Sequence, residues 1–407
     1  MDNKWEKNTL LFLTSQTISL FGSLLVQHAI GWHITLETQS GVMMTIAIIC
    51  GFLPTFFLSP FAGVWADRYN RKMLIVLSDT MIAVTTLMMA ILFLSGYKAL
   101  WLIFVMSAIR ALGTAVQMPT VGAFLPQIVP EDKLTKVNAA YGSIQSMIML
   151  VSPMLSGVLL TVTKIEIIFF IDVITAAIAV MILLIYLHVP VHAKALKNQP
   201  IGYVSDLREG FAYIKNNKFI KKLFVFCAIY FILIAPVAFL TPLQVARSFG
   251  PDVWRLTAVE IAFSAGMMAG GIIMASWGGF NNKIHSMVLA TIVTGLCTFS
   301  LGIVPVFLIY LFIMGLIGIV MPLFNTPFTV LLQQKIEEDF LGRVFGVFVM
   351  ISSSMMPMGM VVFGPVSDII KIEWLLIGTG LLMFAQSFFL LGNKALIEAG
   401  KPVLKKI

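Results

Sequence analysis

Four ionisable residues interrupt long apolar stretches of this sequence, where an unpaired charge is unfavourable. One is Arg110, and the carboxylic acids Asp79, Asp172 and Glu260 occur in three further apolar stretches. An arginine in the middle of a membrane-spanning helix costs at least about 2.5–3.5 kcal/mol, so it has to face protein and find partners there. A carboxyl group in such surroundings can bind a proton and release it when a cation or water reaches it. These residues are therefore candidates for proton transfer.

Each of these charges also has a purely structural interpretation. Backbone carbonyl groups can satisfy Arg110, and an acidic residue near a helix end can cap that helix or pair two helices. The sequence leaves both interpretations open for each residue.

A denser group of charges lies between Gly63 and Lys72. It contains Asp67, Arg68, Arg71 and Lys72, in a chain in which 11% of residues are charged. Apolar segments of membrane length flank it, which predicts a tight turn at a membrane surface. The Asp67 carboxylate can bind backbone N–H groups at a helix N-terminus or pair with a cation such as Arg343. The alternative is a simple anchor, in which the basic residues only hold the turn on one side.

The elements that must position these residues are membrane-spanning helices. The chain has 407 residues, of which 59% are hydrophobic, and a mean hydropathy of +0.97, which excludes a soluble globular protein. A span needs about 20 apolar residues. On that criterion we predict twelve spans, at residues 9–31, 42–66, 73–95, 99–120, 138–161, 167–187, 223–246, 256–278, 285–304, 306–332, 344–366 and 373–392.

The lysines and arginines predict the orientation of these spans. Most of the 27 basic residues fall in loops on the same side as the N-terminus. Cytoplasmic loops carry this excess, so both termini are expected in the cytoplasm. The formal net charge of +8 is thus a topology signal and not the footprint of a nucleic-acid partner.

An internal repeat divides the chain into two halves. The segment Glu131–Val137 resembles Glu338–Val344, and each enters the fifth span of its half. We therefore predict an all-α membrane protein with two six-helix bundles, at residues 1–187 and 223–407. Residues 188–222 would form a cytoplasmic linker with a basic amphipathic helix; a solvated basic linker is the alternative.

The sequence offers no support for a cofactor, a metal or an enzyme. Cys50, Cys227 and Cys297 are far apart inside apolar runs, which argues against a disulfide framework or a zinc site. No span combines catalytic residues, and a GxxxxGK[ST] stretch for ATP is missing. Energy for any transport is then expected from a proton gradient.

The Gly63–Lys72 turn resembles the signature G-x-x-x-D-R-x-G-R-[KR] of the major facilitator superfamily, with Asn70 at the second glycine. Asparagine tolerates a left-handed backbone, so we expect the turn to be kept. Other stretches resemble the drug:proton antiporter branch of that family, which includes bacterial macrolide and tetracycline efflux proteins. These stretches include Gly51–Pro54, Pro130–Leu134, Ser152–Gly157, Ile171-Asp172 and Leu341–Val344.

The resemblance implies roles for several of these residues. The Gly63–Lys72 turn, with Arg343, would latch one conformation of the transport cycle, and the fourth-span Arg110 would take part in proton transfer. The element Ser152-Pro153-Met154-Leu155-Ser156-Gly157 resembles the fifth-span hinge of exporters, although serines replace glycine at two positions. Proline removes a backbone hydrogen bond there, and small neighbours permit close packing.

The resemblance also implies a substrate cavity between the first, fourth, seventh and tenth spans. Uncharged hydrogen-bonding residues there suit an amphipathic molecule with rings better than a sugar or a phosphate. The cavity candidates are Gln27, His28, Gln117, Tyr230 and Asn325.

The function we expect is proton-coupled antiport that exports macrolide- or tetracycline-like antibiotics by alternating access. The expected setting is the plasma membrane of a bacterial cell, with a monomer in the lipid bilayer and with drug and protons as partners. Alternatives are an importer or exporter of another small amphipathic metabolite, and a membrane scaffold or receptor without transport. The buried acids favour transport, because unused charge in a membrane is costly.

Overall fold

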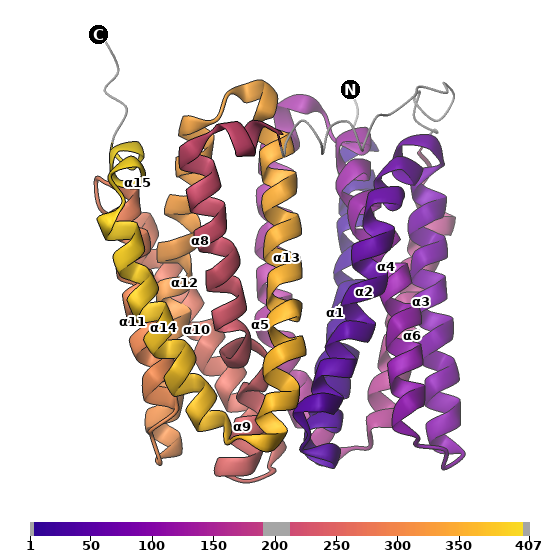
Figure 1. Ribbon diagram of the computed structural model, residues 1–407. Helices are drawn as coiled ribbons and strands as arrows, with labels where there is room; N and C mark the ends of the chain where they lie inside the picture. The colour runs from indigo at the N-terminus through magenta and orange to yellow at the C-terminus, as the bar shows by residue number, and fades with distance from the viewer. Residues whose placement is uncertain (1–3, 190–211, 402–407) are drawn as a thin grey trace. The chain divides into compact units, whose positions relative to one another are not determined.

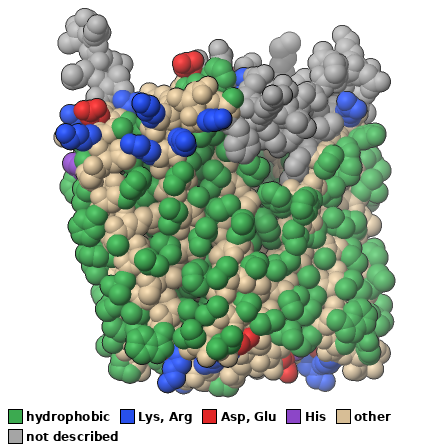
Figure 2. Space-filling model, viewed as in Figure 1, with side chains coloured by type: hydrophobic (Ala, Val, Ile, Leu, Met, Phe, Trp, Pro, Cys, Tyr) green, Lys and Arg blue, Asp and Glu red, His purple; other side chains and the backbone are tan. Residues whose placement is uncertain are grey.

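A computed structural model describes residues 4–189 and 212–401, apart from some side chains within them. These residues form helices, and twelve of the helical segments are long and apolar enough to cross a membrane. Figure 2 shows apolar side chains along the helices and charged side chains near the helix ends. A helix satisfies its own backbone hydrogen bonds, which lipid cannot do. The predicted all-α membrane fold is confirmed.

The chain divides into two compact units. The first comprises Met1–Glu37 and Ile46–Ile201, and the second comprises Thr38–Thr45 and Gly202–Ile407. The boundary near residue 201 falls inside the predicted linker. The assignment of Thr38–Thr45 to the second unit was not expected from the sequence.

The helices that contribute to the first unit are long and are joined by short turns (Figure 1). In chain order they are α1 (Lys4–Thr38), α2 (Gly41–Arg68), α3 (Arg71–Leu94), α4 (Leu100–Ile128), the 3₁₀ turn η1 (Glu131–Lys133), α5 (Leu134–Val162), α6 (Ile165–Met181) and the π-helical turn η2 (Ile182–Tyr186).

The second unit repeats this plan with a more broken first span. That span consists of α8 (Lys218–Ala235), the π-helical turn η4 (Pro236–Leu240) and α9 (Thr241–Ser248). The remaining helices are α10 (Val253–Trp277), α11 (Lys283–Leu301), α12 (Phe307–Lys335), α13 (Glu338–Ile369), α14 (Ile372–Gly392) and the short α15 (Lys394–Ala399).

Helix pairing supports the repeat. In the first unit α3 packs against α4 and α6, and at the equivalent place in the second unit α11 packs against α12 and α14. Glycines allow a close approach between α10 and α12: a Cβ on Gly266 would lie 2.1 Å from the carbonyl oxygen of Gly315. In a membrane such close packing of small residues holds helices together.

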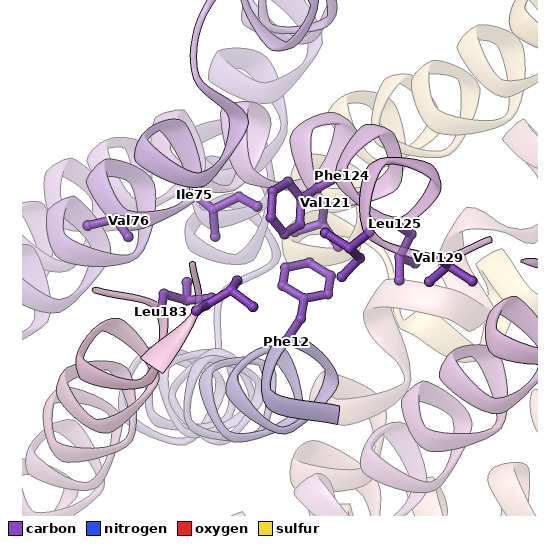
Figure 3. Close-up of a cluster of buried hydrophobic side chains, with 10 residues drawn as sticks. Phe12, Ile75, Val76, Val121, Phe124, Leu125, Val129 and Leu183 are labelled. Carbon is purple, nitrogen blue, oxygen red and sulfur yellow. The ribbon is translucent and has the colours of Figure 1, made fainter. Parts of the chain in front are cut away.

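An apolar cluster fixes one end of the first unit (Figure 3). Phe12 of α1 points toward Val121, Phe124 and Leu125 of α4, and the Phe12 and Phe124 ring centroids are 4.9 Å apart. Leu183 of η2 is fully buried in the same cluster. This packing sets the register of α1 against α4, and so the height of the polar residues further along both helices.

The predicted amphipathic linker helix falls largely outside the described residues, which resume at 212. Residues 212–216 are helical, and Asn217 then caps α8 by accepting hydrogen bonds from the Phe219 and Ile220 amides. The seventh span therefore begins at Lys218, before the predicted start at residue 223. A side-chain cap of this kind satisfies amides that have no partner within the helix.

Candidate functional site

The centre of the first unit holds a buried ion pair between two of the predicted residues. Arg110 of α4 places Nη1 2.6 Å from Oδ2 of Asp172 on α6. The Asp172 side chain is 0% exposed and that of Arg110 is 11% exposed. A pair at this depth is stable only with good geometry and further hydrogen bonds.

Two more helices supply those hydrogen bonds. The Thr86 hydroxyl on α3 accepts a hydrogen bond from Arg110 Nη1 and lies 2.9 Å from Asp172 Oδ2. Ser23 on α1 donates to Asp172 Oδ1 over 3.3 Å, and its carbonyl oxygen lies 3.5 Å from Arg110 Nη2. Both carboxylate oxygens thus have partners, and four helices meet at one pair of charges.

Two glycines let these helices approach. A Cβ on Gly22 would lie 2.1 Å from Thr175 Oγ1 and 3.0 Å from the Asp172 Cα, so only glycine lets α1 reach α6 at this level. A Cβ on Gly113 would lie 2.7 Å from Ile82 Cγ1, which brings α4 close to α3. These close contacts hold Ser23, next to Gly22, and Arg110, one turn before Gly113, beside Asp172.

A second buried carboxyl group, that of Asp79, lies on the face of α3 that also carries Thr86. Asp79 precedes Thr86 by two helical turns and is 1% exposed. Its Oδ1 accepts hydrogen bonds from Ser19 Oγ on α1, over 3.0 Å, and from Gln117 Nε2 on α4. Gln16 on α1 also lies beside Asp79. Asp79 Oδ2 and Gln16 Nε2 find no hydrogen-bonding partner among the described residues.

The α1 side of this region is a polar stripe formed by Gln16, Ser19 and Ser23. Their spacing of three and four residues places them on one helix face. Sequence reasoning did not select these residues, nor Thr86 on α3. The signal that could have identified the stripe was the helical spacing of three polar residues within an apolar run.

The structure does not bring all four predicted proton-transfer residues together. Arg110, Asp172 and Asp79 lie in the first unit, whereas the half-buried Glu260 lies on α10 of the second. Arg110 and Asp172 can hold charge at this site, and proton exchange by any of the predicted residues stays a prediction. Among the described residues, three or more His, Cys, Asp or Glu side chains do not gather anywhere in a metal-binding arrangement.

Two basic residues of the Gly63–Lys72 turn, Arg71 and Lys72, bind backbone carbonyl groups of the first unit. Arg71 donates from Nε to Ala66 O and from Nη1 to Ala123 O, each over 2.8 Å. Lys72 Nζ donates to Leu187 O over 2.7 Å. These contacts join the end of α2 to α4 and join α3 to the residue after η2. The acceptors Ala66 and Leu187 lie at the ends of α2 and η2, where the helix dipole favours positive charge.

Asn70 corrects one expectation about this turn. Its backbone is extended, with φ −63° and ψ 109°, and not left-handed. The side chain accepts a hydrogen bond from the Met73 amide and so caps α3. Asparagine therefore stands here because it caps a helix, and not because it tolerates a positive φ.

The remaining residues of the predicted latch are Gly63, Asp67 and Arg68 within the turn, and Arg343. A Cβ on Gly63 would meet no atom within 4 Å, and the Arg68 side chain is exposed. The Asp67 side chain lies outside the described part of the structure. Arg343 belongs to the second unit, where its guanidinium lies 5.5 Å from the centre of the Phe340 ring. The latch stays a prediction.

The predicted hinge lies within α5, which is continuous through Pro153. Ser152, Pro153, Ser156 and Gly157 are all buried, and Ser156 Oγ donates to Leu25 O of α1 over 3.1 Å. This face of α5 is thus packed on α1 through small residues. Bending of α5 at this point during transport stays a prediction.

The predicted cavity residues have different surroundings. Gln117 contacts Asp79, and His28 places Nδ1 2.8 Å from Leu24 O. Tyr230 is 2% exposed within the second unit, where its ring stacks on Phe324 with centroids 4.8 Å apart. Gln27 and Asn325 are exposed. Their contact with a substrate stays a prediction.

The second unit contains a polar cluster at the end of α13. Asp368 accepts hydrogen bonds from the Gly41 and Val42 amides, over 2.7 Å and 3.0 Å, and pairs with Arg247 of α9 over 2.7 Å. The carboxylate thereby caps the first turn of α2. Gly364 and Asp368 have the same G-x-x-x-D spacing as Gly63 and Asp67 at the end of α2.

Relatives of known name align with most of the chain. Macrolide efflux protein A of Streptococcus pyogenes is 28% identical over 384 residues, which cover 94% of this chain and 95% of that protein. Macrolide efflux protein A of Enterococcus faecalis is 28% identical over 323 residues, covering 79% of this chain and 99% of that protein.

Solved transporters share the fold at low identity. The nucleoside transporter NupG superposes with a TM-score of 0.68 at 16% identity, over 96% of this chain and 99% of that one. A POT family transporter in complex with 5-aminolevulinic acid gives a TM-score of 0.73 at 12% identity, over 94% and 95%. Residues 9–360 match the family described as Major Facilitator Superfamily. With this match, the twelve spans and the repeated bundle, the chain belongs to the major facilitator superfamily.

Proposed function

We propose that the protein exports amphipathic antibiotics of the macrolide type from the cytoplasm in exchange for protons. The observation that carries the drug class is the 28% identity to macrolide efflux proteins along almost the whole of both chains. Tetracycline-like drugs stay within the proposed class, because their efflux proteins belong to the branch that the sequence resembles.

The buried charges support proton coupling. Arg110, Asp172 and Asp79 are placed inside spans of the first unit, where charge without a use is costly. The sequence has no phosphate-binding loop for ATP. A proton moving down its gradient is then the available source of energy, and its entry would be linked to drug exit by alternating access.

The proposal includes the setting of the protein. We place it in the plasma membrane of a bacterial cell, and the distribution of lysine and arginine favours cytoplasmic positions for both termini. The unit of transport would be a monomer that needs no cofactor, nucleic acid or enzymatic step.

A second candidate is the export or import of another small metabolite. The staphyloferrin A transporter of Staphylococcus aureus aligns with 95% of this chain at 20% identity. A different class of substrate is therefore possible within the same fold, since the fold does not fix the substrate.

A tolerance panel tests the substrate class. The protein is expressed in a bacterial host whose own efflux genes are deleted, and growth is measured in erythromycin, other macrolides and tetracycline. We expect increased tolerance of at least one macrolide, and the Arg110→Gln variant at matched membrane abundance should not confer it. Unchanged growth across the panel would refute antibiotic export and favour the second candidate.

A further inference from the structure

We propose that Asp79 is the carboxyl group that binds and releases the transported proton, and that Arg110 and Asp172 remain a charged pair throughout. This inference rests on the proposed proton-coupled transport and identifies the group that would carry it. It follows from the unequal surroundings of the two buried acids in the first unit.

The surroundings of Asp172 hold it as a carboxylate. Oδ2 lies 2.6 Å from Arg110 and 2.9 Å from the Thr86 hydroxyl, and Oδ1 accepts from Ser23. A proton on Asp172 would break the ion pair and leave the Arg110 guanidinium buried beside a neutral group. An uncompensated charge at this depth is far less favourable than the pair.

The surroundings of Asp79 hold neither charge state so firmly. No ion pair of the described residues includes Asp79, although its side chain is buried. The titratable groups that face it are Asp172 of α6 and Tyr141 of α5, and neither is a cation. Its donors are the neutral Ser19 hydroxyl and Gln117 amide. Burial without a cation allows a carboxyl group to be neutral, so it can take up a proton and release the proton when water reaches it.

The unpartnered atoms mark where the proton would sit. Asp79 Oδ2 has no hydrogen-bonding partner among the described residues, and neither has Nε2 of the adjacent Gln16. An amide offers a donor to a carboxylate and an acceptor to a carboxylic acid. Gln16 can therefore serve Asp79 in both states by turning its amide group, while Ser19 and Gln117 continue to hold Oδ1.

The proton step is a simple acid–base exchange with water. On release, the O–H bond at Asp79 Oδ2 breaks, its electron pair stays on the oxygen, and a water molecule accepts the proton. On uptake, the carboxylate accepts a proton from water on the other side of the membrane. Arg110 and Asp172 keep their charges during both steps, so this site moves one proton in each cycle.

Transport by purified protein in lipid vesicles separates proton movement from drug movement. We expect Asp79→Asn to lose erythromycin accumulation driven by a pH gradient, while exchange of labelled for unlabelled erythromycin, which moves no net proton, persists. The matched control is Asp132→Asn, which removes an exposed carboxyl group in the turn before α5. This variant should retain gradient-driven accumulation and exchange. Gradient-driven accumulation by Asp79→Asn would overturn the assignment.

Infrared spectroscopy tests the assignment without a drug. The carbonyl stretch of a protonated carboxylic acid is followed as the pH of the purified protein is raised. We expect a titrating band in the wild type and in Asp132→Asn, and its absence in Asp79→Asn. A band that persists in Asp79→Asn would overturn the inference. The wild type could show the band, and Asp79→Asn lack it, while wild-type protein fails to transport erythromycin. That result would keep Asp79 as the proton site and reject only erythromycin as the substrate.

A conservative variant guards against misfolding. If Asp79→Asn does not elute as a monodisperse protein, Asp79→Glu keeps a carboxyl group and moves it by one methylene. The titrating band should then shift in position, because its hydrogen-bonding partners change. An unchanged band in Asp79→Glu would show that another carboxyl group titrates.

Discussion

At the scale of single residues, the protein separates a fixed charge pair from an exchangeable acid. Arg110 and Asp172 satisfy each other with help from Thr86 and Ser23. Asp79 is buried close by with only neutral donors. We infer that the charged pair holds the helices of the bundle together and that Asp79 couples transport to the proton gradient.

Breaking the buried pair should strongly destabilise the protein. Asp172→Asn leaves Arg110 charged and unpaired, so we expect a loss of about 3–5 kcal/mol in the free energy of unfolding. Asp132→Asn removes a solvent-exposed pair with Lys133 and should cost at most about 1 kcal/mol. Thermal unfolding of the detergent-solubilised variants measures both losses of stability. Equal unfolding midpoints for Asp172→Asn and Asp132→Asn would contradict a stabilising role of the buried pair.

The sequence identified the acids and the arginine of the site but not their arrangement. Charge in an apolar span stands out because it is costly, and this selected Arg110, Asp172 and Asp79. Serine and threonine do not stand out, since they can bond to a carbonyl of their own helix, as Thr85 does with Met81. Which of them turn to another helix depends on helix rotation, which the sequence does not reveal.

At the scale of helices, close contacts determine where the polar residues meet. Most predicted spans agree with the observed helices to within a turn or so, because length and apolar composition are direct signals. The π-helical turn η4 within the seventh span and the assignment of Thr38–Thr45 to the second unit were not predicted. Both depend on packing between distant segments.

Gly22 should be essential for the contact between α1 and α6. In Gly22→Ala the new Cβ would collide with Thr175 and crowd the Asp172 backbone, so we expect destabilisation of about 1–3 kcal/mol and loss of drug tolerance. Gly31→Ala on the same helix meets no atom within 4 Å and serves as the control. Wild-type tolerance and melting in Gly22→Ala would show that α1 and α6 are farther apart than described.

Asp368 should stabilise the start of α2. Asp368→Asn loses the ion pair with Arg247 and weakens the cap on the Gly41 and Val42 amides, so we expect a loss of about 1–2 kcal/mol. The control is Asp252→Asn, whose pair with Arg255 is longer, at 3.5 Å, and lies within one helical turn. Thermal unfolding again compares the two, and a larger effect of Asp252→Asn would contradict the capping role.

At the scale of the whole molecule, the fold was predictable and the coupling was not. Twelve apolar segments, an internal repeat and the Gly63–Lys72 motif together predicted the major facilitator fold, and the family match confirms it. The identity of the substrate depends on a few side chains that vary within one fold. Proton coupling depends on charge states that a pattern of residues does not specify.

The measurement that tests proton-coupled export most directly follows both fluxes in everted membrane vesicles. Erythromycin is added to vesicles that carry the protein and an imposed pH gradient, and drug uptake is recorded together with the internal pH. We predict that drug enters as protons leave, and that an ionophore that collapses the gradient stops the uptake. Erythromycin uptake that continues at its full rate without a proton gradient would contradict the account.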